Sequence, residues 1–224
     1  MAEYTLVNPA HLAKIPDELD FVAAASVPRA ALTSWQALKD VKEGSSVLIT
    51  GASGAVGRMG VQIAKRNVGE KGKVVAVGGK GSEGLKKLGV DLVVNYREVG
   101  DWVSEVKKEG LVDVLYDCVG EKTLEKSLEL VRDGGRIVTV ASPPPPYADI
   151  KGWNELKERS VDGKFLMVSE SGEDLVKIGG LIKDGAVKTS VSFVVDGLSE
   201  DGVQDGWRRA LQGGIGGSVV VKVL

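Results

Sequence analysis

The sequence predicts an α/β fold, a doubly wound parallel sheet with helices on both faces. Two observations carry this prediction. Short apolar runs alternate with segments of helical spacing from residue 47 to residue 168, and the apolar runs are continuous rather than alternating. Strands that are apolar along their whole length are typical of a parallel sheet buried between two helical layers and built with right-handed crossovers.

A glycine-rich turn follows the first of these runs, Val47–Thr50, and brings Gly51, Gly54 and Gly57 within seven residues. The helical pattern that starts directly afterwards predicts a phosphate site, because the first N–H groups of a helix have no partner within the helix. Ala52 stands where the dinucleotide-binding pattern G-x-G-x-x-G has its first glycine. Taken alone, the glycine-rich turn therefore has an alternative interpretation, in which it only joins a strand to a helix and binds no phosphate.

The other elements follow in order. Residues 2–7 alternate like a strand, and a break at Pro28 separates two helices, Phe21–Ser26 and Ala30–Leu38. After the turn the predicted strands are Lys73–Val77, Leu92–Asn95, Val112–Tyr116, Arg136–Ala141, Lys164–Val168, Val191–Val195 and Ser218–Val223. The predicted helices between them are Glu83–Leu88, Trp102–Lys108, Lys122–Val131, Asp174–Lys183 and one near Val203–Leu211, with Gly134-Gly135 ending the third. The prolines from Pro143 to Pro146 predict an extended loop.

Composition excludes several classes of function. The 29 basic and 31 acidic residues give a net charge of -2, and no basic tract points to nucleic acid or a membrane surface. With one cysteine and one histidine, the chain forms no internal disulfide and no cluster of soft metal ligands. Cys118 lies in an apolar run and is predicted to be a buried structural thiol. The absence of a signal pattern predicts a cytoplasmic location.

The end of the second strand predicts which nucleotide binds. If the turn holds a pyrophosphate, this end meets the adenosine ribose, where NAD sites carry Asp or Glu. Here the sequence is Gly78-Gly79-Lys80-Gly81-Ser82, which has no carboxylate and offers a cation and a hydroxyl to a 2′-phosphate. NADP(H) is therefore predicted over NAD(H), with a solvated lysine in a glycine-rich turn as the alternative.

Three segments resemble the quinone oxidoreductase-like, zinc-independent branch of the medium-chain dehydrogenase/reductase superfamily: Ala30–Leu38, Gly51–Gly57, and Leu88–Asp91 with Val94–Arg97. The resemblance implies that Thr33 lies near the nicotinamide, that Lys80 and Tyr96 contact the 2′-phosphate, and that Val119, Gly120 and Phe165 line the cofactor channel. Ser218 departs from it, because the family usually has lysine there. The predicted cofactor-binding set is Thr33, Ser53, Gly54, Ala55, Val56, Gly57, Gly78, Gly79, Lys80, Ser82, Tyr96, Val119, Gly120, Ser142 and Phe165, with no catalytic residue or metal ligand assigned.

Members of this family carry a longer, mostly β, N-terminal domain. We therefore expect residues 1–28 to be its remnant, residues 29–185 to form an NADP-binding Rossmann domain, and residues 186–224 to return to the missing domain. The strands at both ends then lack their usual neighbours. They pair with each other, form a homo-oligomer such as a dimer, or belong to a fragment of a longer protein.

The resemblance implies an NADPH-dependent reductase that transfers hydride to a small quinone, enone or related carbonyl compound. A non-catalytic NADP(H)-binding or protein-interaction module is the alternative, because the wall facing the cofactor is largely absent. A third reading, a short-chain dehydrogenase, comes from Tyr147 and Lys151, which match a Tyr-x-x-x-Lys pair. The prolines directly before them oppose the helix that this pair requires.

Overall fold

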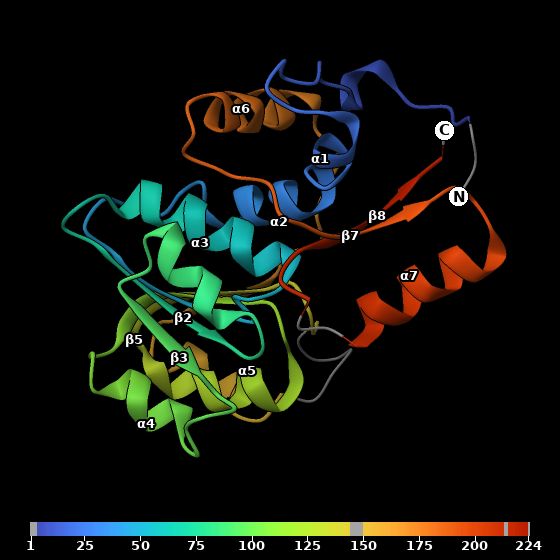
Figure 1. The fold of residues 1–224 in the computed structure, drawn as a ribbon. Coiled ribbons are helices and arrows are strands. Elements are labelled where there is room, and N and C mark those ends of the chain that lie inside the picture. The colour runs from blue at the N-terminus through green and yellow to red at the C-terminus, as the bar shows by residue number, and fades with distance from the viewer. Residues whose placement is uncertain (1–3, 144–149, 213–214, 224) are drawn as a thin grey trace.

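The computed structural model describes residues 4–143, 150–212 and 215–223, and its centre is a six-stranded parallel sheet (Figure 1). The strands run in the order β3-β2-β1-β4-β5-β6. Their bounds are β1 Ser46–Thr50, β2 Lys73–Gly78, β3 Leu92–Asn95, β4 Val112–Asp117, β5 Val131–Thr139 and β6 Asp162–Phe165. The predicted α/β, doubly wound fold is confirmed.

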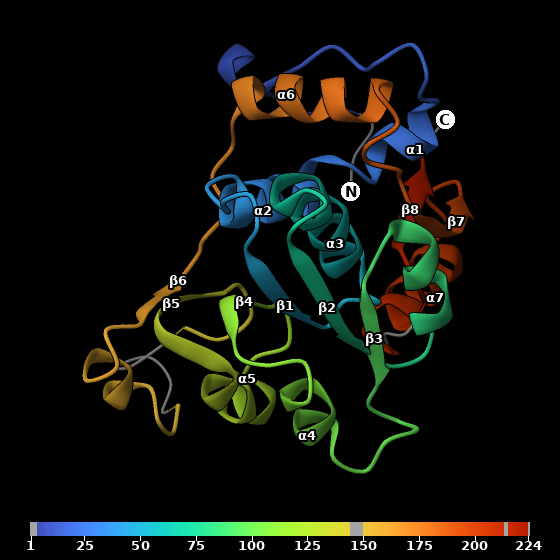
Figure 2. The same ribbon diagram turned by 90° about the vertical axis from the view of Figure 1, so that its left-hand side faces the viewer.

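Helices cover both faces of this sheet. Viewed along the layers, α2 (Pro28–Leu38) and α3 (Ala55–Val68) lie on one face, and α4 (Trp102–Lys107) and α5 (Glu121–Ser127) lie on the other (Figure 2). Helix α6 (Gly172–Lys183) packs outside α2, and the short α1 (Phe21–Ala25) precedes α2. The described part also contains the short 3-10 helices η1 Pro9–His11, η2 Ser82–Leu88, η3 Leu128–Leu130 and η4 Asn154–Lys157. Pro28 is the first residue of α2, where its missing N–H costs no helical hydrogen bond.

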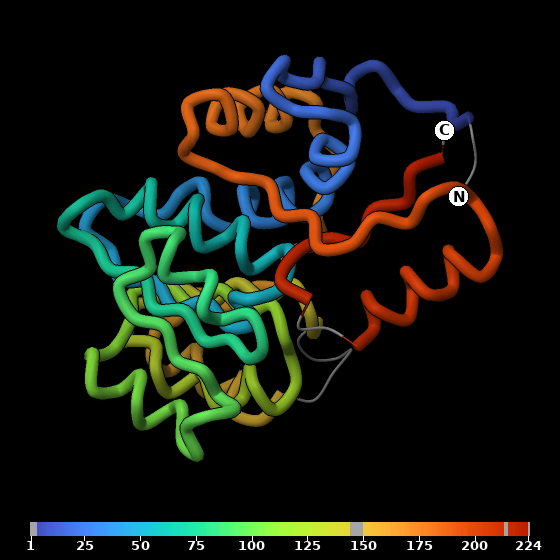
Figure 3. The backbone as a smooth tube through the Cα atoms, in the orientation of Figure 1, coloured from blue at the N-terminus to red at the C-terminus, as the bar shows by residue number. Residues whose placement is uncertain are grey.

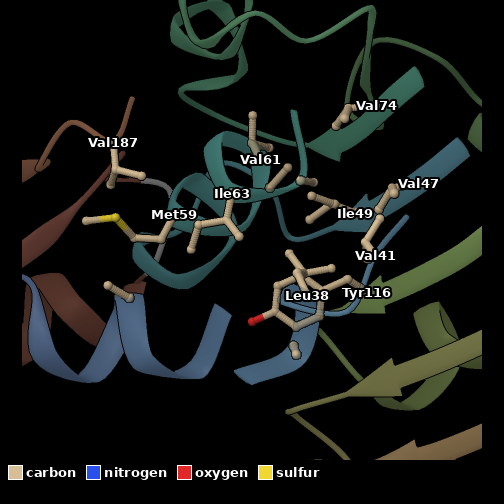
Figure 4. Packing of buried hydrophobic residues seen from close by; sticks show 14 of the residues in the cluster. Leu38, Val41, Val47, Ile49, Met59, Val61, Ile63, Val74, Tyr116 and Val187 are labelled. Atoms are coloured by element: carbon tan, nitrogen blue, oxygen red, sulfur yellow. The ribbon is translucent and has the colours of Figure 1, made fainter. Parts of the chain in front are cut away.

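The alternation of side chains along each strand divides the core in two. Ile49 belongs to the cluster under α2 and α3, which also contains Leu38, Ile63 and Tyr116 (Figure 4). Its neighbour Leu48 belongs to the cluster under α4 and α5. Because successive residues of a strand point to opposite faces, one continuous apolar run supplies both halves of the core.

Helix α3 lies close to the sheet because Gly60 faces the ring of Tyr116. A Cβ at Gly60 would lie 2.7 Å from Cε1 of Tyr116, a distance at which one of the two groups must move. The consequence is that α3 packs directly against β4.

Several predicted elements are corrected. The described residues of the expected first strand, 4–7, are not in a strand. The helix expected over Lys122–Val131 ends earlier, and Gly134-Gly135 lie inside β5 rather than at a helix end. The expected helix Glu83–Leu88 is the 3-10 helix η2. Residues 144–149 lie outside the described part. They include Pro144 to Pro146 of the predicted loop and Tyr147 of the short-chain alternative.

The C-terminal strands form a sheet of their own. β7 (Val191–Asp196) pairs in parallel with β8 (Ser218–Lys222), and α7 (Glu200–Gln212) connects them and packs along both strands. Figure 3 follows the chain from the end of α6 past α2 to this unit. Among the described residues, two of the three strands expected to lack neighbours thus pair with each other. No helix in the described part of the chain is long and apolar enough to cross a membrane.

Candidate nucleotide-binding site

The strand order reverses between β1 and β4, and the crevice where such a sheet would bind a ligand is defined here as the carboxyl ends of these two strands. From β1 the chain adds β2 and β3 to one side, and then returns to add β4, β5 and β6 to the other. At the crevice, a Cβ at Gly51 would lie 2.9 Å from Cγ2 of Val119 and 3.3 Å from Cβ of Cys118. Ligands of open α/β sheets bind at this reversal.

The glycine-rich turn presents free backbone donors to the crevice. Gly51 has a positive φ of 64°, and the N–H of Gly54 donates to its carbonyl at 3.0 Å. The N–H of Arg58 makes the first bond of α3, to the Gly54 carbonyl at 2.9 Å, so Ala55–Gly57 have no partner for their N–H groups within the helix. A Cβ at Gly57 would lie 2.3 Å from the Gly51 carbonyl oxygen. The backbone therefore closes tightly only with glycine there.

Five predicted residues meet at the carboxyl end of β2. A Cβ at Gly78 would lie 2.8 Å from Oγ of Ser82 and 3.2 Å from Cβ of Ser53, and one at Gly79 would lie 2.8 Å from Oη of Tyr96. Ser82 donates to the Gly79 carbonyl, and the Gly79 N–H donates to Oγ of Ser53 at 3.4 Å. The five residues thus lie together at this strand end, and their role in binding a cofactor stays a prediction.

Lys80 follows this cluster directly and is exposed. None of the ion pairs in the described part of the chain uses its ammonium group. The charge is therefore available to an anionic ligand.

A buried carboxylate that the sequence did not single out braces the crevice. Asp117, at the end of β4, is fully buried, and it accepts hydrogen bonds from Oγ1 of Thr50 at 2.6 Å and Oγ1 of Thr139 at 2.8 Å. It also accepts from the N–H groups of Gly120 at 3.0 Å and Val119 at 3.2 Å. One side chain thus joins the ends of β1, β4 and β5 and fixes the turn after β4. The sequence signal was a single acidic residue that ends an apolar run.

The remaining predicted residues on this edge lie beyond that turn. A Cβ at Gly120, whose φ is +80°, would lie 2.1 Å from Oγ of Ser142, and this oxygen accepts from the Glu121 N–H at 3.0 Å. Phe165 ends β6 and pairs with Thr139. Val119, Gly120 and Ser142 therefore follow β4 and β5, and Phe165 ends β6, at the same edge of the sheet.

Thr33 stands apart from this group. It is buried in α2, and its hydroxyl donates to the Arg29 carbonyl at 2.7 Å. The next residue makes the connection to the turn instead, since Ser34 donates to the Val56 carbonyl at 2.8 Å and lies 3.2 Å from Oη of Tyr116. A role for Thr33 beside the nicotinamide stays a prediction.

A cavity of about 690 Å³ opens beside the turn. Its walls come from the start of α3, the α1–α2 connection, α7 and β8, and Arg29 contributes a cation. Apolar side chains make up most of the lining, with Val56, Val203, Trp207, Val219 and Val221 among them. This apolar space adjoins the Gly54 end of the crevice.

Cys118 was predicted to be buried, but it is half-buried and packs against the core cluster under α2 and α3. Burial, and then the negative charge of Asp117, raise the pKa of the Cys118 thiol far above its ordinary value, which keeps the sulfur protonated. No group of three or more potential metal ligands occurs in the part of the chain that the structure describes. The expected zinc independence stays a prediction.

Comparison with known proteins decides the family. The model of a family described as zinc-binding dehydrogenase matches residues 55–178, more than half of the chain. The chain belongs to this family. Within the zinc-binding dehydrogenases it is a quinone oxidoreductase-like medium-chain dehydrogenase/reductase, as the sequence motifs predicted.

Individual relatives are similar to this chain over different lengths. A probable mitochondrial zinc-binding oxidoreductase of Arthroderma benhamiae is 29% identical over 99% of this chain and 68% of that protein. Human quinone oxidoreductase is 35% identical over 63% of this chain and 44% of that protein. The crystal structure of an NAD-dependent alcohol dehydrogenase superposes with a TM-score of 0.82 at 27% identity, covering 100% of this chain and 65% of that one. The chain thus spans between 44% and 68% of these proteins.

Proposed function

We propose that this chain binds NADP(H) and forms the cofactor-binding part of an NADPH-dependent oxidoreductase that reduces a small quinone, enone or related carbonyl compound. The observation that carries the proposal is the end of β2. Gly78 and Gly79 place no carboxylate beside the ribose site, while the exposed Lys80 offers a cation. A 2′-phosphate is attracted to such a site, and an acid in the same place would repel it.

The turn fits the rest of the nucleotide. The free N–H groups of Ala55–Gly57 and the positive end of the α3 dipole suit a pyrophosphate. Gly54 is exposed and has no side chain between the phosphate and the backbone. Asp117 holds the turn at Val119-Gly120 in place, so that the far wall of the crevice is formed before ligand binds.

The bound cofactor supplies the hydride, and the residues of this chain position it and shield it from water. The apolar cavity beside Val56 suits a small, weakly polar acceptor better than a charged one. Among the relatives, the human protein is a quinone oxidoreductase, which supports this substrate class. The solved alcohol dehydrogenase is NAD-dependent, so the choice of NADP(H) rests on the residues of this chain.

A panel of quinones and enones tests the reaction. The purified 224-residue chain is incubated with NADPH and each acceptor, and the loss of NADPH absorbance is followed. We expect oxidation that depends on both protein and acceptor. NADPH binding without turnover across the whole panel would support the second candidate, a non-catalytic NADP(H)-binding or protein-interaction module. This candidate is favoured by one observation, namely that the chain spans only 44% to 68% of its relatives.

The separate sheet also bears on assembly. β7 and β8 pair only with each other among the described strands, which leaves their outer edges open. Open edges pair with further strands, so we propose that the chain forms a homodimer. Light scattering during size-exclusion chromatography gives the mass directly, and a monomer at all concentrations would contradict the dimer. A cytoplasmic location stays a prediction of the sequence.

A further inference from the structure

Arg58 is the fourth residue of α3 and reaches from this helix to the 3-10 helix η2. A Cβ at Gly84 would lie 3.2 Å from Nη1 and 3.5 Å from Nη2 of Arg58. Gly84 is two residues beyond Ser82, whose hydroxyl belongs to the cluster at the end of β2. The guanidinium therefore lies against η2, beside a residue that is two positions along the chain from Ser82.

This guanidinium lacks protein partners in the described part of the chain. Its Nε is buried and makes no hydrogen bond, and no carboxylate among the described residues forms an ion pair with it. Glu83, the acidic neighbour of Gly84, is exposed and does not pair with it. A partly buried cation without a partner costs free energy, and an anion that binds beside it recovers part of that cost.

The electrostatics point the same way. Burial lowers the pKa of Arg58 because the charged form is removed from water without compensation. Arginine nevertheless stays protonated, and its planar fork of donors matches the oxygens of a phosphate group. The Arg58 guanidinium is thus a charged group whose donors suit the binding of an oxyanion.

Resting on the proposed function, we infer that Arg58 is a specificity-determining residue for NADP(H), which binds the 2′-phosphate from the α3 side while Lys80 binds it from the β2 side. Arg58 and Lys80 come from different elements, α3 and the loop after β2. Two cations on separate elements clamp a dianionic group more firmly than one exposed lysine does, because charge-assisted bonds from arginine to phosphate are directional.

Three variants and three ligands test this inference. Arg58→Gln, Arg58→Lys and the control Arg66→Gln are titrated with NADPH, NADH and 2′,5′-ADP, which carries the same phosphate without the nicotinamide. Arg66 lies on the same helix, is exposed, and donates a hydrogen bond to the side chain of its neighbour Asn67. We expect Arg58→Gln to raise the Kd for NADPH and 2′,5′-ADP by about 10-fold and to leave that for NADH within about twofold. Arg58→Lys, which keeps the charge, falls between, and Arg66→Gln matches the wild type.

Equal losses for NADPH and NADH, or no loss for either, would overturn the role of Arg58. Circular dichroism of each variant shows whether the fold is intact, and Arg58→Lys keeps the inference falsifiable if the glutamine variant unfolds. If the wild-type chain binds NADH as tightly as NADPH, the proposed choice of NADP(H) is itself overturned, whatever the Arg58 variants do. The two failures are therefore distinguishable.

Discussion

The carboxylate of Asp117 accepts a hydrogen bond from the hydroxyl of Thr50 at 2.6 Å, at the point where the strand order reverses. Its other oxygen accepts from Thr139 at 2.8 Å. These bonds join three strands at the edge where the nucleotide is proposed to bind. Asp117 therefore does more than fill the core, because it holds this edge of the sheet together.

Asp117→Ala should therefore destabilise the fold. The change leaves two hydroxyls and the N–H groups of Val119 and Gly120 without their acceptor, at a cost of about 3 kcal/mol. Urea unfolding measures it. Asp133→Ala, which breaks an exposed ion pair with Arg159, is the control and should cost less than about 0.5 kcal/mol. A loss below about 1 kcal/mol for Asp117→Ala would show that the network does not brace the crevice.

The close contact between α3 and the sheet predicts that two glycine-to-alanine substitutions change the stability in opposite directions. In Gly60→Ala the new methyl group meets the fully buried ring of Tyr116, and we expect a loss of about 2 kcal/mol. Gly180→Ala in α6 has open space around its Cβ and should gain about 0.5 to 1 kcal/mol from helix propensity. Thermal unfolding compares the two, and effects of the same sign would contradict this packing.

The fold was largely predictable because it depends on local pattern. Leu92–Asn95 matches β3, since a short apolar run bounded by polar residues leaves no other choice. The failures have physical causes. Residues 4–7 alternate like a strand, yet a strand forms only where another strand pairs with it. Val131 was placed at a helix end, although the chain turns through η3 and enters β5 there, and Gly134-Gly135 lie within that strand.

The site was predictable only in part. Glycines and Lys80 can be recognised from their spacing, because a turn and a strand end bring them together locally. Asp117 was missed because its donors come from β1 and β5, which become its neighbours only through the strand order. Arg58 was missed because its burial depends on how η2 covers α3.

The thiol of Cys118 should react slowly in the native state. Burial, and then the charge of Asp117, raise its pKa, so the nucleophilic thiolate is rare at pH 8. We expect labelling by a disulfide reagent about 100-fold slower than in urea. Because the fold holds the thiol neutral, stability is fully present below the thiol's ordinary pKa and falls as the pH rises above it. Fast labelling of the native protein would contradict the structural role.

A charge reversal at Lys80 tests the end of β2. Lys80→Asp places a carboxylate at an exposed position, where NAD sites carry an acid, and should raise the Kd for NADPH by about 10-fold or more while leaving NADH within about twofold. Lys42→Asp, an exposed lysine that precedes β1 at the opposite edge of the sheet, is the matched control. If both reversals weaken NADPH binding equally, the effect comes from net charge rather than from a specific contact.

The most direct test of NADP(H) binding is a titration of the unmodified chain with NADPH and with NADH at the same ionic strength, followed by the fluorescence of the reduced nicotinamide. The geometry around Gly78, Gly79 and Lys80 predicts binding of NADPH at least about 10-fold tighter than that of NADH. Equal binding of the two cofactors, or tighter binding of NADH, would contradict it.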